Sequence, residues 1–159
     1  MKDELDVTME DILENMEDIM ENVEQYGVAI QHIYPTEDDP GPSFCYTIGL
    51  TKINRPEIIT FSLPPKLGQS LLNSLAIGHN SNYQVDTLLT ELASLPMTVK
   101  EIDDMEFVRN EYLCAATALY GVYQVNQLVW PDKEKNFPWD IGYDQRFNDA
   151  QPCYFKTLH

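Results

Sequence analysis

Aromatic residues and aspartates gather in one late, proline-rich segment of the sequence. Trp130-Pro131-Asp132 is followed closely by Phe137-Pro138-Trp139 and then by Tyr143. Because a proline restricts its own φ angle and the residue before it, this segment is stiffened without a helix or a strand. Trp and Tyr are most stable where the ring is buried and its polar end finds a partner. We therefore expect an ordered aromatic wall that frames a pocket.

Polar residues that could complete such a pocket lie much earlier in the chain. Alternation along Phe44–Leu50 puts Thr47 and Gly49 on one face, and a glycine inside a strand often marks close approach by a backbone or a ligand. Arg55 and Glu57 follow at the mouth of a predicted hairpin, where a guanidinium can clamp a carboxylate or phosphate. The candidate ligand-binding residues are Thr47, Gly49, Arg55, Glu57, Trp130, Asp132, Trp139 and Tyr143.

Each candidate also has a structural interpretation. Gly49 can serve sheet curvature alone, and Arg55 and Glu57 can form a surface ion pair. Two of the three residues Asp132, Asp140 and Glu57 could share acid–base chemistry or a divalent cation, but we favour backbone hydrogen bonding of each aspartate in a turn by about two to one. The histidines lack the HxH or HxxxH spacing of a metal site, so no metal is predicted. Catalytic residues and a cofactor are not assigned.

Composition limits the class of protein. A chain of 159 residues that is 43% hydrophobic can bury one core without disulfides or a structural metal. Its three widely spaced cysteines form no CxxC motif, which favours a reducing compartment, and no apolar run is long enough to cross a bilayer. A net charge of -16 disfavours direct nucleic-acid binding and anionic membranes. We expect a cytoplasmic protein.

The N-terminal segment is strongly acidic. Residues 1–24 hold ten acidic side chains against one lysine. Apolar residues recur there at threes and fours, which predicts an amphipathic helix over about residues 8–25, with a Thr8–Asp11 capping box and a stop near Gly27. We divide the chain into this acidic helix, residues 1–25, and a single domain, residues 26–159. Packing on its own domain is favoured about two to one over a protein partner or a homodimer through residues 8–25.

The rest of the chain predicts an α+β fold. Strands are expected at residues 28–34, 44–50, 57–63, 97–102 and 122–130, and helices at residues 65–78, 86–92 and 107–120. The short link between the second and third strands favours antiparallel pairing. Strands outnumber helices and rarely alternate with them, so we expect a mostly antiparallel sheet of about five strands covered by two or three helices.

A set of short motifs occurs in a recognisable order. The motifs are Tyr46-Thr47-Ile48-Gly49-Leu50, Arg55-Pro56-Glu57, Leu63-Pro64, Leu72-Asn73, Val129-Trp130-Pro131-Asp132, Phe137-Pro138-Trp139 and Gln151-Pro152. This order resembles the bacterial and phage family called domain of unknown function 4262, from about Tyr26 to Pro152, although the family commonly has His where Arg55 stands. The resemblance implies a fold and no established reaction. The opening is also similar to flavin-reductase-type split barrels, which suggests a split-barrel-like arrangement.

Two functions stay open. The first is binding of a small planar anionic ligand, nucleotide- or flavin-like, between Thr47–Glu57 and Trp130–Tyr143, with Arg55 holding the anion. The second is an acidic interaction or inhibitor protein that acts through its N-terminal helix, such as a phage counter-defence protein or a nucleic-acid mimic. We prefer the first, because the family-like motifs lie in the body of the chain. Whether the protein is an enzyme stays open.

Overall fold

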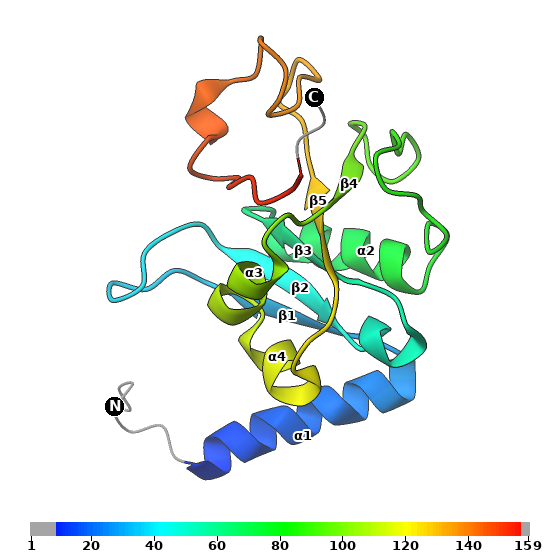
Figure 1. Cartoon of the computed structure of the whole chain (residues 1–159), viewed down its shortest axis with the longest axis vertical. Coiled ribbons are helices and arrows are strands. Elements are labelled where there is room, and N and C mark those ends of the chain that lie inside the picture. The colour runs from blue at the N-terminus through cyan, green and yellow to red at the C-terminus, as the bar shows by residue number, and fades with distance from the viewer. Residues whose placement is uncertain (1–8, 157–159) are drawn as a thin grey trace.

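The computed structural model describes residues 9–156, and it has the expected α+β architecture (Figure 1). The elements follow in this order: α1 (Met9–Tyr26), β1 (Ala29–Ile33), β2 (Phe44–Ile48), η2 (Leu50–Ile53), β3 (Glu57–Phe61), α2 (Pro65–Ala76), β4 (Thr98–Glu101), α3 (Met105–Glu111), α4 (Cys114–Tyr120), β5 (Val125–Val129) and η3 (Gln145–Phe147). All five predicted strands are present, and the prediction of a mostly antiparallel sheet is confirmed.

The strands form one open sheet in the order β1-β2-β3-β5-β4. Three of the four strand pairs are antiparallel, and β3 pairs with β5 in parallel. The edge strands β1 and β4 are separated by the other three, so the sheet does not close and the split-barrel expectation was wrong. The parallel pair needs a long crossover, which α2, β4, α3 and α4 supply.

The sheet is covered on both faces. The central strand β3 is buried along its whole length, and its side chains alternate between two hydrophobic clusters. Ile59 and Phe61 pack in the cluster that includes Val108 of α3, whereas Ile58 packs in the cluster that includes Leu72 of α2. Burial on both faces explains why this strand reads as a nearly continuous apolar run.

One predicted helix is absent and another is divided. Residues 86–92 form turns and a β-bridge between Leu89 and Met97, because Asp86 takes a positive φ of 63° and its amide donates to Val99. The helix predicted at residues 107–120 is two helices, α3 and α4, which meet at Leu113. The Leu113 side chain is fully buried and its ψ angle of 54° is not helical, so burial overrides the helical periodicity.

The acidic helix α1 packs against the body of the protein through part of its apolar stripe. Ile19 and Val23 are buried in the cluster that covers one sheet face, whereas Leu13 and Met20 are more than half exposed. Gly27 ends the helix as predicted, with a positive φ and an amide that donates to the Val23 carbonyl. The predicted Thr8 cap lies outside the described residues. No helix within residues 9–156 combines the length and apolar character that crossing a membrane requires.

Candidate functional site

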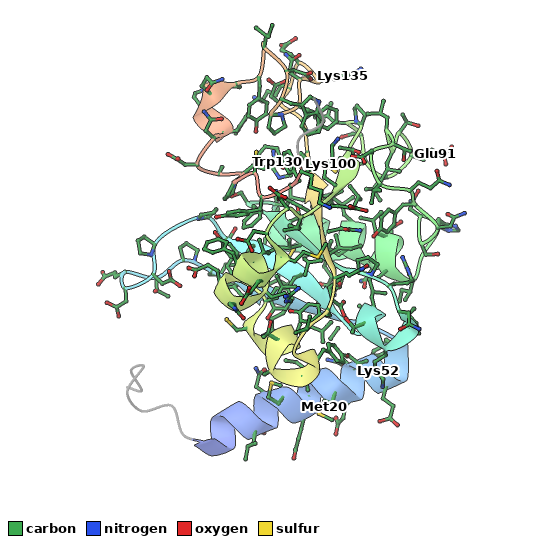
Figure 2. All side chains as sticks on the ribbon, viewed as in Figure 1. Met20, Lys52, Glu91, Lys100, Trp130 and Lys135 are labelled. Carbon is green, nitrogen blue, oxygen red and sulfur yellow. The ribbon has the colours of Figure 1, made fainter. Side chains whose placement is uncertain are left out.

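The predicted site residues fall into two groups at opposite ends of β3. Glu57 is the first residue of this strand, whereas Trp130 Nε1 donates to the carbonyl of its last residue, Phe61, at 2.9 Å. Four strand steps of roughly 3.3 Å place these ends about 13 Å apart. Figure 2 shows Lys52 of η2 beside α1, and Trp130 well away from it in the upper part of the molecule. The structure does not bring the two groups together, so the composite pocket that we expected between them is not formed.

Glu57 is the centre of a buried hydrogen-bond network. Its Oε1 atom accepts from the Thr47 hydroxyl at 2.8 Å and from the Leu50 amide at 3.2 Å. Its Oε2 atom accepts from the Gly49 amide at 3.2 Å, the Thr51 amide at 2.9 Å and the Thr51 hydroxyl at 2.6 Å. The side chain is fully buried. With five donors already in place, this carboxylate anchors the turn between β2 and β3.

Thr47 and Gly49 also serve the interior. The Thr47 hydroxyl donates to Glu57 and accepts from the Ile58 amide at 2.9 Å. Gly49 has a φ of 127°, and a Cβ atom built there would lie 2.6 Å from the Gly27 carbonyl oxygen and 3.1 Å from Val23 Cγ1. The close approach that the glycine permits is therefore made by the end of α1.

The second group forms a packed segment against the far end of the sheet. Asp132 is buried and accepts from the amides of Glu134, Asn136 and Asp144 at 2.9 Å each. Gln151 bonds both backbone groups of Trp130, which ties the C-terminal segment to the end of β5. These contacts agree with the structural interpretation of Asp132.

The aromatic side chains of this segment pack mainly on one another. Phe137 stacks on Trp139 with ring centroids 4.9 Å apart and an interplanar angle of 3°, and Phe155 meets the Trp139 ring edge-on at 5.5 Å. The Lys100 ammonium lies 4.6 Å from the same ring centroid. Tyr143 is buried, and its hydroxyl accepts from Gln151 Nε2 at 3.2 Å. The aromatic cluster is thus ordered, with Trp139 at its half-exposed margin.

Arg55 differs from the other predicted residues because it borders a cavity. Its guanidinium donates to the carbonyls of Ala76 at 2.6 Å, Leu75 at 3.0 Å and Ser81 at 2.8 Å. Two of these carbonyls end α2, where the helix dipole is negative. A guanidinium has five N–H donors, so two remain for another acceptor. Among the described residues, no carboxylate forms an ion pair with Arg55.

The cavity beside Arg55 has a volume of about 370 Å³. It lies where β3 and β5 begin and β4 ends, and its polar lining comes mainly from Arg55, Tyr83, Glu101, Gln124, Asn126 and Lys156. Asn126 is only 3% exposed, and its Nδ2 atom donates to the Tyr83 hydroxyl at 3.2 Å. No hydrogen bond within residues 9–156 reaches Asn126 Oδ1. Burial raises the pKa of the Tyr83 hydroxyl, which therefore stays protonated at neutral pH.

The sequence reasoning missed most of these lining residues. Asn126 and Gln127 interrupt an otherwise apolar strand, and buried amides need hydrogen-bond partners. This pair could therefore have indicated a buried polar site from the sequence alone. Gln127 uses its amide to hold the backbone of Pro152 and Tyr154. Tyr83 and Lys156 lie outside the named helices and strands, and no sequence spacing connects them to Arg55.

A family model described as a domain of unknown function, DUF4262, matches residues 22–144 of the chain. The chain belongs to the DUF4262 family. The match confirms the resemblance found in the sequence, and it spans all five strands, Arg55, Tyr83 and Asn126. Comparison with curated proteins and with solved structures finds no match. The DUF4262 match leaves out Lys156 and the larger part of α1.

Proposed function

We propose that this DUF4262 protein binds a small anionic ligand in the cavity beside Arg55. The observation that carries the proposal is a half-buried guanidinium, held by three backbone carbonyls, with no carboxylate paired to its charge among the described residues. Removing a charged group from water is unfavourable unless another charge or dipole compensates it. The three carbonyl dipoles supply part of that compensation, and a bound anion that accepts from the two remaining N–H groups completes it. The cavity volume falls in the range of small-molecule sites.

The charges of the residues that line the cavity also favour an anionic ligand. The cavity has two cationic residues, Arg55 and Lys156, and one carboxylate, Glu101, which pairs with Lys156 at 3.4 Å. A net positive lining stands out in a chain whose net charge is -16. An anion that approaches this otherwise acidic protein is attracted locally to the cavity.

The neutral polar groups indicate what the rest of the ligand is like. The buried Asn126 amide and the Tyr83 hydroxyl can each hydrogen-bond a planar polar group, and the Tyr83 ring lies 5.9 Å from the Arg55 guanidinium carbon. Tyr83 is the aromatic side chain of this lining, whereas Trp139 is not part of the lining and stacks on Phe137. A nucleoside monophosphate fits this chemistry better than a flavin, whose wide ring system needs a larger apolar surface for stacking.

The test is isothermal titration of the protein with AMP, FMN and inorganic phosphate as probes. Asn126→Asp preserves the side-chain shape and adds a negative charge beside Arg55, so it should weaken AMP binding by at least about tenfold, which corresponds to roughly 1.4 kcal/mol. Lys156→Gln should weaken it less, because this side chain is half exposed. Lys135→Gln, at the far end of the molecule in Figure 2, is the matched control and should change nothing. Failure of all three probes to bind, or equal AMP affinity in folded Asn126→Asp, would contradict the proposal.

A further inference from the structure

A second, apolar cavity lies between α1 and α4. Its volume is about 280 Å³, and it is lined by Met20, Val23, Glu24, Lys52, Leu119 and Tyr120. Figure 2 shows Met20 on α1 below α4, and Lys52 nearer the C-terminal end of α1. The groove is therefore built from an acidic helix on one side and from α4, whose seven residues Cys114–Tyr120 carry no charged side chain, on the other.

The apolar stripe of α1 is wider than the surface that the body of the protein covers. Ile19 and Val23 are buried, whereas Leu13 is 56% and Met20 is 54% exposed. Leu13 and Met20 lie seven residues apart, close to two helical turns, so they lie along one line of the helix surface. Burial of such side chains stabilises a protein, and for Leu13 and Met20 this stabilisation is only partly realised.

The charges on α1 show what kind of partner suits the groove. Between residues 13 and 26 the helix has five exposed acidic side chains and no basic one: Glu14, Glu17, Asp18, Glu21 and Glu24. None of the five pairs with a basic residue in the described part of the chain. Like charges four residues apart destabilise a helix, and an acidic side chain in the last turn opposes the helix dipole.

We infer that this groove is a docking surface for a basic amphipathic helix of another protein. An apolar anchor of the partner fills the space between Met20 and Leu119, and its lysine or arginine side chains lie along Glu17, Glu21 and Glu24. This is the helix-in-groove mode of recognition, with charge complementarity selecting the partner. A second copy of this chain would bring two acidic helices together, and like-charge repulsion opposes that arrangement. Lys52, the one basic residue of the cavity lining, faces a neutral or acidic position of the partner.

The test measures binding of a synthetic amphipathic helix of leucine and lysine, matched in length to α1, to the full chain by fluorescence anisotropy at physiological salt. The lysine peptide should bind, and its glutamate counterpart should not. Met20→Asp should weaken binding at least about tenfold by placing a charge in the groove, although it adds a negative charge to the helix. Leu88→Asp is the matched control, because Leu88 is 58% exposed, lies outside this groove and gives the same change in net charge.

The charge complementarity is tested separately. Glu17→Lys with Glu21→Lys should weaken binding at least about tenfold, whereas Asp38→Lys with Asp39→Lys, which makes the same net change in an exposed loop, should alter it little. Circular dichroism must show each variant folded. If test and control variants lose the same peptide affinity, the attraction is non-specific and the inference is overturned. The inference is also overturned if the lysine peptide does not bind. Concentration-dependent self-association that Met20→Asp removes identifies a second copy as the occupant, which overturns the choice of partner.

Discussion

Replacement of Glu57 by glutamine tests whether one buried carboxylate holds the turn between β2 and β3. The substitution keeps the size and shape of the side chain but converts one acceptor oxygen into an NH₂ donor. If the amide nitrogen takes the position of Oε1, it faces the Thr47 hydroxyl and the Leu50 N–H. If it takes the position of Oε2, it faces the N–H groups of Gly49 and Thr51. In either orientation at least one buried backbone donor loses its acceptor.

The structure gives the size of the effect. An unsatisfied buried donor costs about 1–3 kcal/mol, and hydrogen bonds to the remaining oxygen lose their charge assistance, so we expect Glu57→Gln to lower the free energy of unfolding by about 3 kcal/mol. For a domain of this size each kcal/mol shifts Tm by roughly 2–4 °C, which predicts a decrease of about 6–12 °C. Total stabilities of roughly 5–15 kcal/mol leave the variant folded.

Urea unfolding followed by tryptophan fluorescence measures this difference directly, and Glu37→Gln is the control. Glu37 is exposed in the loop between β1 and β2 and should change the free energy of unfolding by less than about 0.5 kcal/mol. A Glu57→Gln variant within about 1 kcal/mol of the parent protein would refute the reasoning, because it would mean that the five hydrogen bonds contribute no net stability.

Three further predictions concern the backbone at Gly49, the pH dependence of stability and the aromatic cluster around Trp139. Gly49→Ala should lose about 2–4 kcal/mol in urea unfolding because φ is 127° and the new Cβ meets the Gly27 carbonyl, whereas Gly121→Ala, with open space around it, should lose about 1 kcal/mol. Burial raises the pKa of the Cys45 thiol from 9.0 to about 12 and that of the Tyr46 hydroxyl from 10.0 to about 12. The folded state therefore keeps protons that the unfolded chain releases, so the free energy of unfolding should fall as pH rises from about 9 to about 12. Unfolding curves recorded at a series of pH values measure this decrease. In Cys45→Ala the decrease should begin nearer pH 10, because only the tyrosine contribution remains. A flat profile would contradict this. Trp139→Ala removes the stack on Phe137 and the Lys100 contact, so it should lower the free energy of unfolding by about 1–2 kcal/mol, as measured by thermal unfolding. AMP affinity at the Arg55 cavity should stay unchanged. A loss of AMP affinity in the folded variant would mean that Trp139 belongs to the binding site.

Local patterns predicted most of the elements correctly. The apolar spacing of α1 with its Gly27 stop, the β-rich runs and the short link from β2 to β3 are short-range signals, and each produced the expected element. The pattern at residues 86–92 misled because Leu89 takes part in a bridge with Met97, a contact that helical spacing does not encode. The end of α3 and the start of α4 at Leu113 were not predicted for the same reason, since burial of the Leu113 side chain depends on elements far away in the sequence.

For the candidate site, too, the sequence predicted the chemistry of single residues but not which of them lie together. Residue types alone singled out Arg55 as an anion anchor, and Arg55 does border a cavity. They also suggested that Glu57 and Trp130 share a pocket, because a sequence does not reveal which end of a strand another segment reaches. The tertiary structure places these two residues at opposite ends of β3.

The sequence by itself determined the fold class, the acidic amphipathic helix and the stiff aromatic segment, because periodicity, charge and proline geometry act over a few residues. Strand order was decided only by the tertiary structure. The parallel pairing of β3 with β5 brings Asn126 to the start of β3 near Arg55, and the packing of α1 buries Val23 while it leaves Met20 exposed. These placements depend on which buried surfaces fit together across the whole chain, and that information is non-local.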